Sequence, residues 1–141
     1  MKEGIVLTKI DDRGVAEVSL NRPERNNAYN GEMISELIKS FTSLNENNDV
    51  RIVMIRGLGK HFQGGADLEW LKEIGKLNEQ ENIEVSRNTA SAIKGLTEFP
   101  KPTIAMIHGG CFGGGTGIAA AADIVIASED AIFSIAEAKW G

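Results

Sequence analysis

Two segments of the chain follow one pattern, in which a short apolar run leads into glycines and then into the start of a helix. Residues 52–55 precede the loop Gln63-Gly64-Gly65-Ala66-Asp67, and residues 104–107 precede a glycine-rich loop over residues 109–117. Glycine lets the backbone turn tightly and lets a ligand approach main-chain N–H groups. Strands that alternate with helices in this way indicate an α/β fold.

The remaining segments fit the same fold class. Residues 5–10 and 15–20 are β-rich runs around a short polar linker, which predicts a hairpin. Apolar residues recur every three or four positions from Asn30 onward, which predicts a helix. A second long helix is expected near residues 81–98, and a further strand over 123–127.

Three local expectations can be tested against the structure. The continuous apolar run within residues 50–56 is typical of a strand that is covered on both faces. The polar segment 21–27 is expected to be a loop that is not helical around Pro23. Asp67 is expected to cap a short helix whose leucines share one face.

Composition excludes several classes of protein. With 141 residues the chain is expected to form one domain, over residues 1–141, and its 15 basic against 20 acidic side chains argue against general nucleic-acid binding. No apolar run is long enough for a membrane span, so no membrane partner is expected. The single cysteine, Cys111, excludes an internal disulfide and fits a cytoplasmic protein.

The two glycine loops allow more than one use of their backbone. A helix that begins behind a loop points free N–H groups at negative charge, so two such loops could form an oxyanion hole. A phosphate cradle is the competing use, but no Lys-Ser/Thr pair follows the glycines and no G-x-G-x-x-G register fits. A third interpretation is that the glycines only let the helix pack tightly on the sheet.

Glu137 is the charged residue that best fits acid/base chemistry. It lies in the mostly apolar segment 131–138, where partial desolvation would raise the pKa of a carboxylate toward values useful for proton transfer. An ordinary carboxylate at a strand end is the alternative. Simpler roles are expected elsewhere: helix cap or turn for Asp67 and Asp123, loop positions for His61 and His108, and no nucleophilic role for Cys111.

Several motifs resemble the crotonase (enoyl-CoA hydratase/isomerase) superfamily, in family order and spacing. They cover residues 20–28, 62–68, 101–109, 112–115, 122–124 and 133–141. The resemblance implies a spiral of strand–strand–helix units, acyl-CoA thioester substrates, no metal or redox cofactor, and assembly as homotrimers or hexamers at full length. Family members are nearly twice as long, so the chain is expected to cover only the N-terminal half or so, with the C-terminal part absent.

By position, the resemblance implies that the backbone N–H groups of Ala66 and Gly114 hold the thioester oxygen. It implies that Glu137 is the acid/base. The family's second catalytic glutamate falls at Gly117, where this chain has no side chain. The residues implied in binding the CoA thioester are Arg25, Ala28, Gly64, Gly65, Asp67, Leu68, Gly113 and Gly117.

Three functions follow from this resemblance. Details in residues 113–118 and 133–141 look most like a bacterial subgroup that hydrates 3-methylglutaconyl-CoA or isohexenylglutaconyl-CoA, in leucine or terpene breakdown, which favours a hydratase. A double-bond isomerase, in which Glu137 is the single base, is the alternative. The third possibility is a non-catalytic, truncated fragment.

Overall fold

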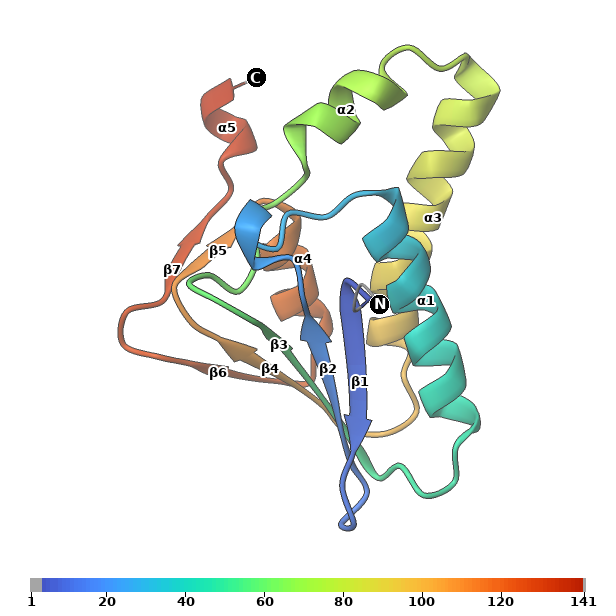
Figure 1. The fold of residues 1–141 in the computed structure, drawn as a ribbon, viewed down its shortest axis with the longest axis vertical. Coiled ribbons are helices and arrows are strands. Elements are labelled where there is room, and N and C mark those ends of the chain that lie inside the picture. The colour runs from blue at the N-terminus through green and yellow to red at the C-terminus, as the bar shows by residue number, and fades with distance from the viewer. Residues whose placement is uncertain (1–3, 141) are drawn as a thin grey trace.

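A five-stranded sheet organises the chain, and the computed structural model describes it over residues 4–140 (Figure 1). Its order is β1 (Val6–Ile10), β2 (Val15–Leu20), β3 (Ile52–Gly57), β4 (Thr103–Ile107) and β6 (Ile124–Ala127). The first two strands are antiparallel, which confirms the predicted hairpin, and the other pairs are parallel. The parallel pairs place the carboxyl ends of β3 and β4, and hence both glycine loops, at one edge of the sheet.

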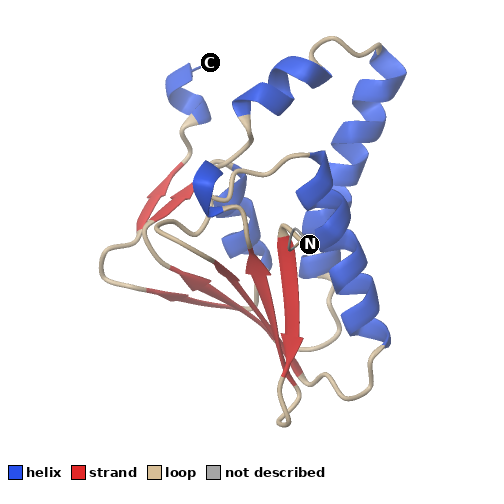
Figure 2. Cartoon of the chain, in the orientation of Figure 1, coloured by secondary structure: helices blue, strands red, loops and turns tan. Residues whose placement is uncertain are grey.

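Helices cover one face of this sheet (Figure 2). They are α1 (Gly31–Glu46), α3 (Glu79–Thr97) and α4 (Gly114–Ala121), and α1 and α3 begin at the side-chain caps Asn30 and Asn78. Their apolar stripes bury the core between helices and sheet. The largest fully buried apolar side chains include Leu20, Met33, Leu44, Val53, Ile55, Phe62 and Leu96.

The sequence did not predict a second, two-stranded sheet. It pairs β5 (Gly110–Phe112) with β7 (Ile132–Ser134) in parallel, and α5 (Glu137–Trp140) follows it. The strands have three residues each, too few for an alternating pattern to be visible. This sheet carries the segment after β6 back to the glycine loops, next to α2 (Leu68–Ile74) (Figure 1).

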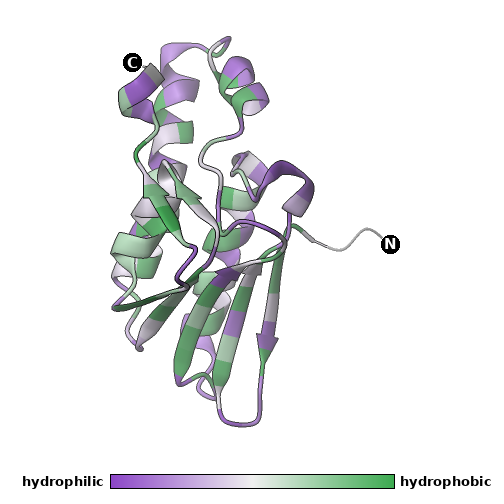
Figure 3. Cartoon of the chain, turned by 90° about the vertical axis from the view of Figure 1, so that its left-hand side faces the viewer, coloured by the Kyte–Doolittle hydropathy of each residue, from purple (hydrophilic) through white to green (hydrophobic). Residues whose placement is uncertain are grey.

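The open face of the main sheet corrects the prediction that β3 is covered on both sides. Val53 and Ile55 are buried toward the helices, whereas Ile52 and Met54 are half-buried on a face that no helix of residues 4–140 covers. Figure 3 shows this face, where hydrophobic residues, in green, make up much of the strands. All four residues of β6 are exposed, so a continuous apolar run did not indicate two-sided burial here.

The segment around Pro23 differs from its predicted conformation. The segment that was expected to be non-helical contains a short 3-10 helix, Pro23–Arg25, with proline in its first turn, where a missing N–H costs nothing. No helix in residues 4–140 is long and apolar enough to cross a membrane.

Candidate active site

Hydrogen bonds join the two glycine loops, as expected for loops that follow neighbouring strands. The N–H of Gln63 donates to the carbonyl of Gly110 at 3.1 Å, and the N–H of Phe112 donates to the carbonyl of Gln63 at 2.9 Å. Gly65 has φ +90°, and a Cβ at this position would lie 3.3 Å from the carbonyl oxygen of Phe112. Glycine is therefore needed at Gly65 both for its conformation and for the close approach of the second loop.

A cavity of about 510 Å³ lies where these loops meet. The first loop, the start of α2, the end of β5 and the start of α5 all contribute to its wall. It brings together six of the predicted site residues. Its lining consists of Gly64, Gly65, Ala66, Leu68, Leu71, Phe112, Gly113, Ala136 and Glu137.

Both loops present N–H groups that have no acceptor within residues 4–140, and those of Ala66 and Gly114 are among them. The hydrogen bonds of the first loop engage the N–H groups of Gly64 and Asp67 but not that of Ala66. In the second loop the N–H of Gly113 donates to Ser134 at 2.9 Å, while that of Gly114, the first residue of α4, is unpaired. These are the two donors that the family resemblance implies, and the start of a helix adds partial positive charge at Gly114.

Glu137 lies next to the second donor. Its Oε1 would be 2.5 Å from a Cβ on Gly113, so the carboxylate occupies the space that a side chain at Gly113 would take. Glu137 is the first residue of α5 and is exposed, as are Phe133 and Ile135 before it. The expectation of partial desolvation is therefore wrong for these surroundings, because the apolar segment around Glu137 is itself exposed.

Asp67 has the structural role predicted for it. Its Oδ1 accepts from the N–H groups of Glu69 and Trp70 at the start of α2, and its Oδ2 lies 2.6 Å from Nη1 of Arg22. Burial raises the pKa of this carboxyl, but the hydrogen bonds from Arg22 and the two amides outweigh it, so the pKa lies below its usual value. With its carboxylate engaged in this way, Asp67 could meet a ligand mainly through its backbone.

The other residues implied in CoA binding lie outside the cavity wall. Arg25 is exposed and pairs with Glu69 at 2.7 Å. The carbonyl of Ala28 accepts from Arg22 at 3.0 Å. A Cβ at Gly117 would meet no atom within 4 Å, so the space beside this residue on α4 is open.

The remaining polar candidates have structural partners. Asp123 accepts from the N–H of Thr103 at 2.8 Å, and His61 Nδ1 accepts from the N–H of Gly110 at 2.8 Å. Cys111 is buried, which raises the pKa of its thiol to about 11 and makes it a poor nucleophile. Residues 4–140 contain no cluster of three or more potential metal ligands.

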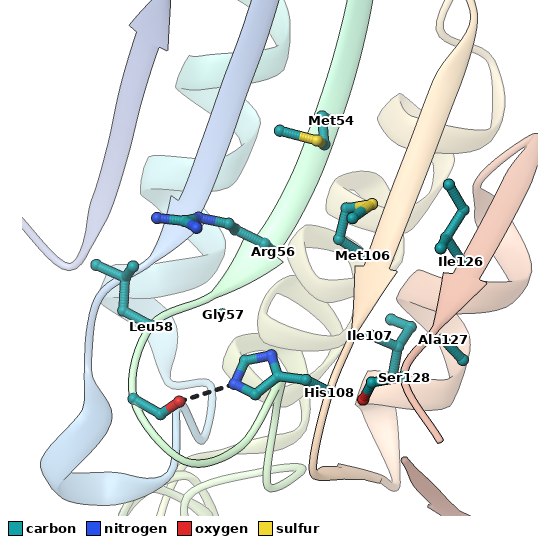
Figure 4. A pocket seen from close by; sticks show the side chains of 11 residues that line it. Met54, Arg56, Gly57, Leu58, Met106, Ile107, His108, Ile126, Ala127 and Ser128 are labelled. Carbon is teal, nitrogen blue, oxygen red and sulfur yellow. Dashed lines mark hydrogen bonds between the residues drawn. The ribbon is translucent and has the colours of Figure 1, made fainter. Parts of the chain in front are cut away.

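A second cavity, also of about 510 Å³, lies on the open face of the sheet (Figure 4). Met54, Met106 and Ile126 line its apolar part. Its polar groups already have partners: Arg56 lies 3.1 Å from Glu17, and His108 Nε2 lies 2.7 Å from the carbonyl of Gly59. It contains none of the predicted catalytic residues, so the cavity at the glycine loops is the candidate active site.

Tyr29 is a residue of the site region that sequence reasoning did not single out. Its backbone makes two hydrogen bonds with the first loop. The N–H of Tyr29 donates to the carbonyl of Gly65 at 2.8 Å, and the carbonyl of Tyr29 accepts from the N–H of Asp67 at 2.9 Å. Its ring lies against Gly114, where a Cβ would come within 2.5 Å of Cε1. The available signal was that Tyr29, the single tyrosine of the chain, directly follows one of the family motifs.

Comparison with known proteins places the chain in a family. The family model for enoyl-CoA hydratase/isomerase matches residues 11–141, so the chain belongs to this family. The fold is crotonase-like α/β, as the sequence predicted: the structure of an enoyl-CoA hydratase from Shewanella pealeana superimposes with a TM-score of 0.93, at 34% identity, over 97% of this chain and 51% of that one.

Curated relatives carry both hydratase and isomerase names. A peroxisomal Delta(3,5)-Delta(2,4)-dienoyl-CoA isomerase of Arabidopsis thaliana is 37% identical over 94% of this chain and 51% of its own length. A hydroxycinnamoyl-CoA hydratase-lyase of Pseudomonas fluorescens is 34% identical over 96% of this chain and 50% of its own length. The chain thus spans about half the length of these relatives, and it belongs to a family of enzymes that act on acyl-CoA thioesters.

Proposed function

We propose that this chain supplies the oxyanion hole and the acid/base carboxylate for adding water to a 2-enoyl-CoA thioester. The observation that carries the proposal is that Ala66, whose N–H is unpaired, and Glu137 line one cavity, while the unpaired N–H of Gly114 belongs to the residue directly after the lining residue Gly113. Backbone donors of this kind cost nothing to reorganise when negative charge develops on the thioester oxygen. Each is worth about 10²–10³ in rate.

The reaction then forms one C–O bond in place of the C2–C3 π bond and needs two proton transfers. The thioester oxygen accepts hydrogen bonds from Ala66 and Gly114 while the oxygen of a water molecule bonds to C3 of the enoyl group. Glu137 takes a proton from that water and returns one to C2, so that the atoms of one water molecule are added across the double bond. We propose that no metal or redox cofactor takes part, because hydration is redox-neutral and the backbone N–H groups supply the charge stabilisation that a metal ion would otherwise provide.

Double-bond isomerisation is the second candidate, and Gly117 favours it. The side chain at this position is missing, and no atom lies within 4 Å of where its Cβ would be, so Glu137 is the carboxylate left to manage protons. One carboxylate is sufficient to remove a proton at one carbon and return it at another. The relative named as a dienoyl-CoA isomerase is consistent with this alternative.

We also propose the finer properties that the family resemblance implies. These are a branched glutaconyl-type acyl group, assembly of the whole protein as a trimer or hexamer, and a cytoplasmic location. The similarity of residues 113–118 and 133–141 to the glutaconyl-CoA hydratase subgroup supports the choice of acyl group.

A product-mass assay tests the proposal. The chain is supplied with a panel of conjugated 2-enoyl-CoA thioesters, and we expect loss of the enoyl absorbance with a product heavier by one water. An unchanged mass with a moved double bond would support the isomerase, and no turnover would leave a non-catalytic fragment. Glu137→Gln should abolish turnover and retain CoA binding, whereas Glu129→Gln, at an exposed position, should behave as wild type.

A further inference from the structure

Tyr29 and Glu137 approach consecutive residues of the second glycine loop. A Cβ on Gly113 would come within 2.5 Å of Oε1 of Glu137, and a Cβ on Gly114 within 2.5 Å of Cε1 and 3.2 Å of Cζ of Tyr29. Cζ carries the phenol hydroxyl. The side chains of Glu137 and Tyr29 therefore lie beside Gly113 and Gly114, the second of which carries the N–H donor proposed for the oxyanion.

The position of the Tyr29 ring is fixed by both loops. Its backbone is hydrogen-bonded on either side of Ala66, the other proposed donor, and its ring packs edge-on against Trp70 with 5.7 Å between ring centroids. An edge-to-face pair of this kind favours one orientation of the ring. Tyr29 thus contacts the first loop through its backbone and the second through its ring.

The hydroxyl of Tyr29 is available for a ligand. It makes no hydrogen bond within residues 4–140, although Tyr29 is half-buried. Burial and the negative charge of Glu137 both raise the pKa of the phenol, which keeps its proton in place at neutral pH. Two charged residues beside the backbone of Ala28 and Tyr29, Arg22 and Asp67, pair with each other at 2.6 Å.

We propose that Tyr29 is a second catalytic group of this site, whose hydroxyl hydrogen-bonds to the water that Glu137 activates. Gly117 lies one helical turn after Gly114, so the two residues share a face of α4. The Tyr29 ring therefore packs on the face of α4 at which the family's second glutamate would stand. The phenol orients the water oxygen toward C3 and keeps its own proton. Glu137 accepts the proton that the water loses. The proposal rests on the hydratase function.

The single tyrosine allows a test that does not need turnover. Phenolate absorbance is followed as the pH is raised, and it reports Tyr29 alone because the chain has one tyrosine. We expect a midpoint above the ordinary value of 10.0, shifted down in Glu137→Gln and unchanged in Glu129→Gln. Equal midpoints in wild type and Glu137→Gln, with circular dichroism showing folded protein, would overturn the pairing.

The product-mass assay separates this proposal from the hydratase function itself. Tyr29→Phe keeps the ring and its packing, and should lower kcat for hydration by about 10- to 100-fold with little change in KM, as expected for one lost hydrogen bond to a developing charge. If Tyr29→Phe hydrates the substrate at the wild-type rate, the proposed role of Tyr29 is wrong, and the hydratase function is unaffected. Absence of hydration by the wild type would instead overturn the hydratase function. The titration would still show whether Glu137 influences the phenol of Tyr29.

Discussion

The two glycine loops present similar N–H groups but are held in different ways. In the first loop a buried carboxylate, Asp67, caps α2 and pairs with Arg22 at 2.6 Å. In the second loop Gly113 precedes α4 with no side-chain cap, and both Gly109 and Gly113 have positive φ. The first loop therefore adds an ion pair and a side-chain cap to its one positive-φ glycine, Gly65, whereas the second has two positive-φ glycines and no side-chain cap.

The largest effect should come from removing the anchor of the first loop. Asp67→Ala leaves Arg22, which is 15% exposed, without its partner and also removes the cap of α2, so we expect a loss of about 3 kcal/mol in the free energy of unfolding. Urea denaturation measures it. Asp67→Asn retains a capping oxygen and should lose less. A loss below about 1 kcal/mol in Asp67→Ala would show that the ion pair does not hold this loop.

The second loop should be most sensitive at Gly109. Its φ is +56°, and a Cβ there would lie 2.2 Å from the backbone oxygen of Lys60, which cannot move without its loop. We expect Gly109→Ala to lower the free energy of unfolding by about 2–3 kcal/mol, from backbone strain and steric overlap.

Gly75 provides the matched control for Gly109. It ends α2 with φ −64°, and the nearest atom to an added Cβ is 3.4 Å away. Gly75→Ala should therefore change the free energy of unfolding by less than about 1 kcal/mol. Equal losses in the two variants would mean that positive φ is not what holds the second loop.

The difference between the loops also explains what the sequence could predict. Asp67 was recognisable as a cap because a capping residue and its helix are neighbours in the chain, and the same holds for the hairpin and the long helices. The partner of Asp67, Arg22, lies 45 positions away and left no local signal. Local patterns predicted the elements, whereas contacts across the fold did not follow from them.

Exposure was the property that the sequence predicted least well. The apolar run of β3 suggested a strand buried on both faces, yet Ile52 and Met54 are only half-buried, and in the neighbouring part of the sheet Ile124 and Ile126 are 51% and 50% exposed. The same reasoning wrongly placed Glu137 in a desolvated environment. An apolar run indicates that burial of its side chains is favourable. Which segment covers them depends on tertiary contacts, and the sequence of the run does not specify those.

Acid should weaken the ion pair that holds the first loop. The pKa of Asp67 is lower in the folded protein than its ordinary value of 3.8, so its contribution to stability is complete above that pH and is lost as the pH falls through the lower, folded value. Urea unfolding of wild type and Asp67→Asn between neutral pH and acid isolates this carboxyl from the others. We expect the two stability curves to converge as the pH falls below the ordinary carboxyl range. Curves that stay parallel would contradict the ion pair.

The smallest effect is expected at Gly117, and its sign is opposite. Gly117 lies within α4 without a positive φ, and an added Cβ would meet no atom within 4 Å. Alanine is more favourable than glycine in a helix by about 0.8–1.0 kcal/mol, so Gly117→Ala should stabilise the chain by up to about 1 kcal/mol. Thermal unfolding of the two proteins measures the gain. Glycine at this position costs stability, and no steric contact requires it, so we infer that its role is to leave the space beside α4 open. If Gly117→Ala is more stable but binds acyl-CoA more weakly, that space is part of the substrate's binding site. A destabilised variant would instead mean that Gly117 serves the packing of the second loop, like Gly109.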